Sequence, residues 1–335
     1  MRRPALLALV VALVALALVL LPRARQRAPA MEQLVLPWVP LCERTSTIFV
    51  SVASYRDQLC RSTLASMFTR ATFPARVFVG VYQQNDLESE ACVVDPRFAP
   101  QVRVVTVPAS AATGPCTARY QCSLLMRDEA VFLQVDSHSI FADGWDVHAI
   151  RMLRSLPGAQ TGSAVISTYP VNCDQGWEGS DPPVIDKARY DGSWITFEAT
   201  IRNDAAQRFV PSRQIGGGFL LCVADVVRRV PFDPHLAGVF NGEELLYTAR
   251  LFTHGIDVVA PTRSIVCHKY AYAEHRTVWT DNKAWNTGGG NERADKLQSG
   301  LLDDEFGFGT ARPLSEFWKH VGIDYQRRHV GEWPY

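Results

Sequence analysis

Four short runs of β-branched and aromatic residues, with expected helices between some of them, constrain the fold of this chain most strongly. Runs of this length and composition are typical of buried strands. The segment 57–70 places apolar residues at helical spacing, and 117–128 is a second expected helix. Strands that alternate with helices predict an α/β fold with a mostly parallel sheet that helices cover on both faces. The expected strands are 47–52, 77–82, 102–107 and 130–135.

Asp136 and His138 directly follow the fourth expected strand, and this position makes them candidate ligands. In α/β folds, ligands gather beyond the carboxyl ends of the parallel strands. Residues two apart on extended backbone point to the same side, so the carboxylate and the imidazole converge. Oxygen and nitrogen ligands suit a divalent ion such as Mn²⁺, whose open positions a diphosphate can fill. Taken alone, however, such a triplet is more often an ordinary turn at a strand end.

Residues 5–21 form an uninterrupted apolar run with arginines on both sides of it. A membrane-spanning helix needs about 17 apolar residues or more, whereas a cleaved signal peptide has a run of about 7–15. The sequence therefore predicts a transmembrane anchor within residues 1–21, a stem at 22–45 and one folded domain at 46–335. The flanking arginines are nearly balanced, so charge does not fix the orientation of the anchor.

The charged residues argue against nucleic acid as a partner, and the cysteines argue against a zinc site. The 34 basic and 34 acidic residues balance, and no basic stripe lies beyond the anchor, so nucleic acid is not an expected partner. The eight cysteines form no Cys-x-x-Cys pair, which argues against a zinc framework. Their positions are compatible with disulfides in an oxidising compartment and with buried thiols, and the sequence does not choose between these.

Nine short segments around the Asp-Ser-His triplet form an ordered set along the chain. They are 48–57, 114–119, 132–138, 141–146, 216–219, 231–236, 240–244, 249–255 and 308–314. The set resembles the protein-hydroxyproline N-acetylglucosaminyltransferase family, whose members use UDP-GlcNAc. It is more distantly similar to the mucin-type GalNAc-transferases. Each segment alone is unspecific, but their order is not. The sequence departs from the family pattern at Ser139, where a bulkier residue is expected, and in the segment 172–191, which has no clear counterpart.

The resemblance implies a GT-A fold, the type of the nucleotide-diphospho-sugar transferases, with Mn²⁺ or another divalent cation held by Asp136 and His138. His268, which ends the apolar run 264–268, is the expected third ligand. The GalNAc-transferases likewise pair an Asp-x-His triplet with a later histidine. A histidine at a strand end is also commonly a structural hydrogen-bond donor.

The resemblance further implies a nucleotide-sugar site next to the first strand and a run of glycines. Arg56 and Arg119 suit phosphate or uracil oxygens. The alternative for each is a solvated surface arginine, and the position of Arg56 at the carboxyl end of a strand favours the binding role for it. The glycines at 216–218 are not followed by the Lys-Ser/Thr of a phosphate-binding loop, so we expect them to let backbone approach the donor sugar. The expected donor-binding residues are Ser54, Arg56, Arg119, Asp136, Gly217 and Gly218.

Glu243 and Glu244 begin an expected helix at 243–253, which Gly255 ends. Acidic residues in a first turn interact favourably with the helix dipole. The resemblance instead implies a catalytic role, in which one of the two hydrogen-bonds hydroxyls of the sugar or the acceptor. It does not identify which glutamate acts.

The expected function is metal-dependent transfer of GlcNAc from UDP-GlcNAc to a protein hydroxyl, on hydroxyproline or on Ser/Thr, with retention. The expected location is a single-pass membrane protein of type II with its catalytic domain in the Golgi or ER lumen. One alternative is the same fold with another nucleotide-sugar or a glycan acceptor. The other is a non-catalytic lumenal sugar-binding protein.

Overall fold

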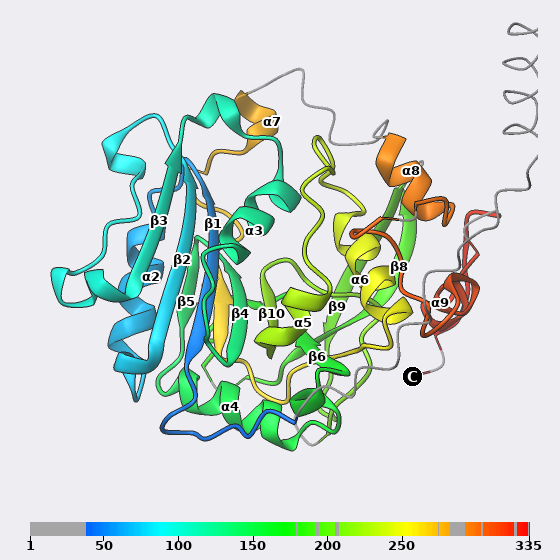
Figure 1. Cartoon of the computed structure of the whole chain (residues 1–335), viewed down its shortest axis with the longest axis horizontal. Coiled ribbons are helices and arrows are strands. Elements are labelled where there is room, and N and C mark those ends of the chain that lie inside the picture. The colour runs from blue at the N-terminus through cyan, green and yellow to red at the C-terminus, as the bar shows by residue number, and fades with distance from the viewer. Residues whose placement is uncertain are drawn as a thin grey trace, which may run out of the picture. The chain divides into compact units, whose positions relative to one another are not determined.

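A seven-stranded sheet forms the centre of the protein (Figure 1). Across the sheet, its strands are β11 (Asp257–Val259), β6 (Ala164–Ser167), β10 (Phe219–Val223), β4 (Val131–Asp136), β1 (Ile48–Tyr55), β2 (Val77–Gln84) and β3 (Val102–Val107). Neighbouring strands are parallel except for β10, which runs antiparallel to β4 and β6. The predicted α/β fold with a mostly parallel sheet is therefore confirmed.

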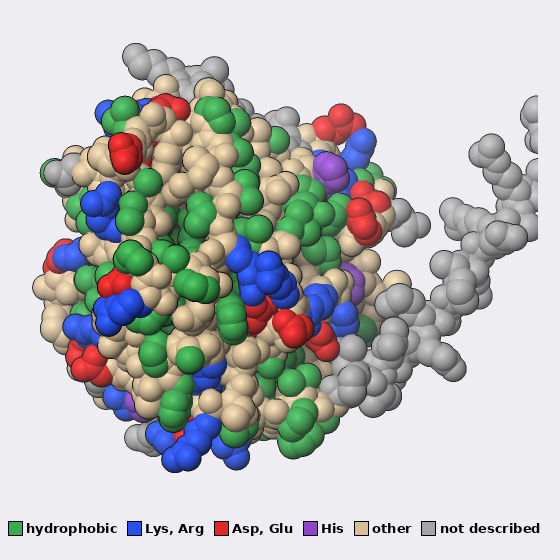
Figure 2. Space-filling view, turned by 60° about the vertical axis from the view of Figure 1, so that its left-hand side comes forward, with side chains coloured by type: hydrophobic (Ala, Val, Ile, Leu, Met, Phe, Trp, Pro, Cys, Tyr) green, Lys and Arg blue, Asp and Glu red, His purple; other side chains and the backbone are tan. Residues whose placement is uncertain are grey.

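In this computed structural model, the described residues are 38–178, 180–191, 194–204, 208–273, 275–281, 292–302, 304–324, 327–333 and 335. The expected membrane anchor and most of the expected stem lie outside them. Within the described part of the chain, no helix is long and apolar enough to cross a membrane. On the face shown in Figure 2, acidic and basic side chains are interspersed and neither kind forms a stripe.

The central strands are covered on both faces. β1, β4, β6 and β10 are buried at nearly all of their positions, as a parallel sheet between layers of helices requires. β3 lies at the edge and is only partly buried. The helices are α2 (Cys60–Thr69), α3 (Pro115–Ser123), α4 (Trp145–Ser155), α5 (Ala224–Arg229), α6 (Glu243–Thr253), α7 (Val278–Asp281), α8 (Glu292–Gln298) and α9 (Leu314–His320).

The helix expected at 117–128 is α3, and it begins and ends earlier than the sequence predicts. Gly114, with a φ of 118°, precedes the helix, and Pro115 occupies its first position. Proline is favoured there because its missing N–H would have no partner inside the helix. The helix expected at 243–253 has the predicted bounds in α6.

A small second sheet carries the later part of the site. It consists of β5 (Ser139–Phe141), β12 (Val266–His268) and β7 (Val171–Asn172), with β12 in the middle. The apolar run 264–268 contains β12, which pairs with β5 and β7 and not with the main sheet. Two hairpins complete the fold, β8 (Pro183–Asp191) with β9 (Trp194–Ile201) and β13 (Ile323–Asp324) with β14 (His329–Val330).

Both cysteine states that the sequence leaves open occur in the structure. Cys60 is bonded to Cys92, and Cys173 to Cys267. Each disulfide fixes a segment that adjoins a candidate functional residue. Cys60 begins α2, and Cys267 directly precedes His268. Three further cysteines are buried thiols and one is an exposed thiol, namely Cys116, Cys122, Cys222 and Cys42.

A buried ion pair joins the start of α4 to the loop after α2. The Asp146 carboxylate is fully buried and lies 2.8 Å from a guanidinium nitrogen of Arg76, whose side chain is 5% exposed. Asp146 also accepts hydrogen bonds from the backbone N–H groups of Thr72 and Phe73. Removing one partner of such a pair is costly because the other charge stays buried.

We predict that Asp146→Asn lowers the free energy of unfolding by about 3 kcal/mol, because the charge of Arg76 loses its partner. Chemical denaturation measures the change. The matched control is Asp143→Asn, which alters a side chain that is 84% exposed in the same segment. This control should stay within about 0.5 kcal/mol of the unaltered protein. Equal stability of the two variants would contradict a structural role for Asp146.

Candidate functional site

A cavity of about 530 Å³ opens at the carboxyl edge of the main sheet. Its wall includes Ser54 from β1, Gln84 from β2 and Asp136 from β4, at the edge where the sequence predicts ligands to gather. The volume lies in the range of small-molecule sites. A more open hollow of about 810 Å³ between α9 and the β13–β14 hairpin has one lining histidine, His329, and none of the candidate ligands.

Asp136, His138 and His268 meet at the wall of this cavity. One ligand atom from each residue can be chosen so that all three lie within 4.8 Å of one another. The Nε2 atom of His268 is 3.1 Å from Oδ2 of Asp136, and the two imidazole rings are 4.4 Å apart. The meeting follows from strand pairing, because β5 begins directly after His138 and its Ser139 pairs with His268.

The second nitrogen of His138 has its own partner. Nδ1 lies 2.7 Å from Oδ2 of Asp57, a buried carboxylate between β1 and α2. Asp57 is not among the residues predicted from the sequence, although it ends the matching segment 48–57. His275 and Tyr272 also lie beside His138, with ring centroids 5.3 and 5.6 Å from it. Their segment has no helix or strand periodicity that would have indicated this position.

Asp136 is ionised in this environment. Burial opposes its charge, but the hydrogen bond with His268 and the charges of His268, His138 and Arg119 outweigh this effect. Together they hold the pKa of the Asp136 carboxyl well below its usual range. A carboxylate oxygen is therefore available beside two imidazole nitrogens, which is a ligand set for a divalent cation.

At each position of the run 216–218, a side chain would approach a different neighbour too closely. A Cβ on Gly216 would lie 2.2 Å from the backbone oxygen of Thr168, and one on Gly217 would lie 2.2 Å from the guanidinium of Arg119. A Cβ on Gly218 would lie 3.1 Å from Oδ2 of Asp136, between this oxygen and Pro170. The first two glycines thus permit packing, and the third leaves space beside the metal-ligand candidates.

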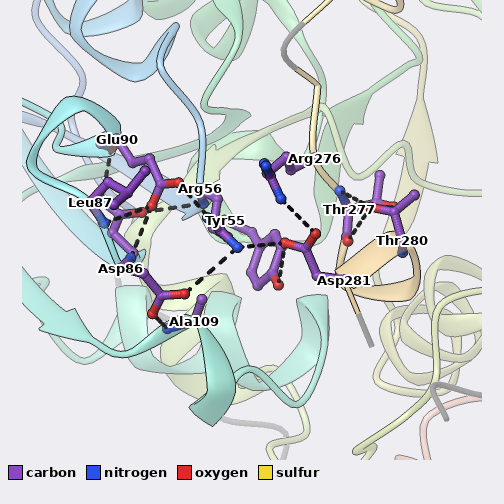
Figure 3. A network of polar contacts seen from close by, with 11 residues as sticks. Tyr55, Arg56, Asp86, Leu87, Glu90, Ala109, Arg276, Thr277, Thr280 and Asp281 are labelled. Carbon is purple, nitrogen blue, oxygen red and sulfur yellow. Dashed lines mark hydrogen bonds and ion pairs between the residues drawn. The ribbon is translucent and has the colours of Figure 1, made fainter. Parts of the chain in front are cut away.

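The two arginines expected to bind the nucleotide both have carboxylate partners. Arg119 lines the cavity, but its guanidinium is paired with Glu243. Arg56 does not line the cavity. Its guanidinium contacts Glu90 at 2.9 Å and Asp281 at 3.0 Å, and Asp86 at 3.7 Å (Figure 3). Arg56 therefore connects the end of β1 to α7.

The two glutamates at the start of α6 have different surroundings. Glu243 is held by Arg119, whereas Glu244 accepts hydrogen bonds from the N–H of Gly217 at 2.6 Å, the Tyr169 hydroxyl at 2.7 Å and Gln214 at 3.1 Å. Burial, together with the charge of Glu243, raises the pKa of Glu244 to about 7. Glu244 is thus the cavity carboxylate that can change its charge near neutral pH.

Comparisons with known proteins bear on the family and on the fold. The family model described as Glycosyltransferase (GlcNAc) matches residues 47–101 and 94–303. No curated protein sequence matches the chain. The crystal structure of GalNAc-T7 with UDP, GalNAc and Mn²⁺ superposes with a TM-score of 0.51 and 13% identity, over 68% of this chain and 44% of that chain. The crystal structure of S. aureus TarS 1-349 gives 0.45 and 12%, over 67% and 60%.

The likeness to GalNAc-T7 concerns the fold, which is of the GT-A type, and this chain spans less than half of that protein's length. The match to the family model carries further, because it extends over more than half of the 335 residues. The protein therefore belongs to the GlcNAc glycosyltransferase family.

Proposed function

We propose that the protein transfers GlcNAc from UDP-GlcNAc to a protein hydroxyl, with a divalent ion at Asp136, His138 and His268. The observation that carries this proposal is the meeting of these three side chains at the wall of the 530 Å³ cavity. The family supports GlcNAc as the transferred sugar. We propose hydroxyproline, or Ser/Thr, as the acceptor side chain.

The donor set supports Mn²⁺ or a similar cation. One carboxylate oxygen and two imidazole nitrogens suit a borderline divalent ion, and they leave coordination positions for phosphate oxygens. The GalNAc-T7 structure, which shares the fold, contains UDP, GalNAc and Mn²⁺. When bound, the ion would neutralise the negative charge that develops on the departing diphosphate.

The wall of the cavity supplies groups that fit a nucleotide-sugar. Ser54 is 1% exposed, and its hydroxyl has no hydrogen-bond partner among the described residues. A buried hydroxyl of this kind is available to a ligand, since an unmade hydrogen bond costs free energy. Gly218 leaves room for the donor beside Asp136. Glu244 would accept a hydrogen bond from a sugar hydroxyl.

The carboxylates of the cavity favour attack from the face of the departing group. A double displacement needs a free carboxylate nucleophile, but Glu243 is paired with Arg119 and Glu244 accepts three hydrogen bonds. Asp136 belongs to the ligand set, and Asp57 is bonded to its own partners. The bond from C1 to the phosphate oxygen would then break as C1 bonds to the acceptor oxygen. The acceptor proton would pass to the departing phosphate.

The mouth of the cavity fits a peptide acceptor. Ile195 and Phe197 of β9 contribute apolar side chains to the wall. Phe240 is 40% exposed and packs on Trp279 of α7, with ring centroids 4.5 Å apart. Aromatic and aliphatic side chains at a partly exposed rim suit the apolar parts of a peptide.

An oxidising compartment is the proposed location, with the chain anchored in the membrane through residues 5–21. The disulfides Cys60–Cys92 and Cys173–Cys267 favour the lumen of the secretory pathway over the cytosol. A type II arrangement would put the described domain there.

The anchor predicts that the full-length chain stays with membranes during an alkaline carbonate wash. A variant that lacks residues 2–27 should be released, because it loses the apolar run and its flanking arginines. Immunoblotting of pellet and supernatant measures the distribution. Full-length chain in the carbonate supernatant would contradict the anchor.

The metal site predicts that sugar transfer requires a divalent ion. We expect the purified chain to turn over UDP-GlcNAc faster than UDP-GalNAc or UDP-glucose in Mn²⁺, and EDTA to abolish turnover. Asp136→Ala should be inactive but folded. His268→Ala should need at least roughly tenfold more Mn²⁺ for its half-maximal rate, because it lacks one ligand.

The control for His268→Ala is His329→Ala, since His329 is an exposed histidine of β14 that does not line the cavity. Its Mn²⁺ requirement should equal that of the unaltered chain. Full turnover in excess EDTA would overturn the metal proposal. Faster turnover of another nucleotide-sugar would replace UDP-GlcNAc as the donor.

Glu244 predicts a pH dependence of kcat/KM. Its three neighbours all donate hydrogen bonds, so the ionised form is the one that fits, and kcat/KM should rise as the pH increases through about 7. Glu244→Gln should lose this limb and lower kcat/KM by roughly 10–100-fold, as the loss of a charged hydrogen bond does. Glu198→Gln, on the exposed side of β9, should keep the limb.

The raised pKa of Glu244 also predicts how the stability of the folded protein changes with pH. The folded pKa of Glu244 lies above the unfolded value of about 4.3, so the folded state binds the proton more tightly. Relative to Glu244→Gln, the unaltered chain should be most stable below about pH 4.3 and lose stability as the pH rises to about 7. A pH-independent stability difference would show that Glu244 does not titrate in this range.

A further inference from the structure

Asp57 is a buried carboxylate with all of its hydrogen bonds directed at fixed partners. Its side chain is 3% exposed. Oδ1 accepts a hydrogen bond from the backbone N–H of Leu59 at 2.8 Å. Oδ2 accepts one from the Ser137 hydroxyl at 2.5 Å and lies 2.7 Å from Nδ1 of His138.

These partners determine which nitrogen of His138 carries the proton. An ionised carboxylate offers only acceptors, so the hydrogen between Asp57 and His138 belongs to Nδ1. In the neutral imidazole Nε2 then keeps its lone pair, which is the form that binds a metal ion. The Tyr272 hydroxyl is 3.4 Å from the same Nδ1 and is the more distant partner.

We propose that Asp57 is a positioning residue of the metal site, which holds His138 as the Nδ1–H tautomer with Nε2 directed at the ion. The inference rests on the proposed metal site and adds a residue that acts through His138. Partners of this kind raise the basicity of a metal-binding histidine and fix its ring, and their loss typically costs about 10–100-fold in metal affinity.

Asp57→Asn is an informative test because the neighbouring groups favour one orientation of the new amide. The N–H of Leu59 can only donate, so the amide oxygen should take the place of Oδ1. The NH₂ group then faces Nδ1 of His138 and donates to it. This moves the ring proton to Nε2, where it blocks the metal position. The opposite amide orientation would set the NH₂ group against the Leu59 N–H.

The experiment measures the Kd for Mn²⁺ of the full chain by electron paramagnetic resonance, without donor or acceptor. The matched control is Glu129→Gln, since Glu129 is a buried carboxylate, 2% exposed, that accepts hydrogen bonds from Arg103 and from the N–H of Arg127. It precedes β4 and so lies at the opposite end of the strand from Asp136. Thermal unfolding of each variant reports structural effects separately.

We expect Asp57→Asn to weaken Mn²⁺ binding about 10–100-fold, and Glu129→Gln to leave it within about twofold. Nitrogen-15 NMR of the unaltered, metal-free chain should show His138 with its proton on Nδ1, and this readout serves even if the variant does not fold. An unchanged Kd in folded Asp57→Asn, or an Nε2–H tautomer in the unaltered chain, would overturn the inference. Absence of Mn²⁺ binding by the unaltered chain would instead overturn the metal site itself, together with this inference.

Discussion

The pairing of β12 with β5 is the contact on which the site depends. β5 begins directly after His138, and His268 pairs with Ser139, so two segments more than a hundred residues apart meet beside Asp136. The Cys173–Cys267 disulfide fixes the residue next to His268. A disulfide at the residue next to a ligand restrains the backbone there and so limits how far the imidazole can move. The candidate ligand set is therefore built by the strand pairing rather than by a single local motif.

The reversed direction of β10 explains why Gly217 and Gly218 line the cavity that contains Asp136. The start of an antiparallel strand lies at the edge where its parallel neighbours end, and Phe219 pairs with Val135. Gly218 is consequently placed against Asp136, and Gly217 against Arg119 and Glu244. A side chain at position 217 would collide with Arg119, and one at position 218 would fill the space beside Asp136. The reversed strand thus places glycines at the edge where the parallel strand β4 ends in Asp136.

Local sequence accounts for β1, β2, β3 and β4 and for α6, because buried β-branched runs and helical periodicity are local signals, whereas β6, β10 and β11 are not among the expected strands. His268 could be anticipated only from the family resemblance, since its partners lie far away in the chain. Asp57 could not be anticipated, because its role depends on Ser137 and His138, about 80 residues later. The same limit applies to Arg56. Its position after β1 suits a phosphate, but Asp281, 225 residues later, contacts its guanidinium.

The central claim is that one aspartate and two histidines hold a divalent ion at the sheet edge. Electron spin-echo measurements on the Mn²⁺-loaded chain count the nitrogen atoms that coordinate the ion. The account predicts couplings from two imidazole nitrogens, of which one disappears in His138→Ala and the other in His268→Ala. Bound Mn²⁺ without any imidazole coupling would place the ion elsewhere and contradict the account.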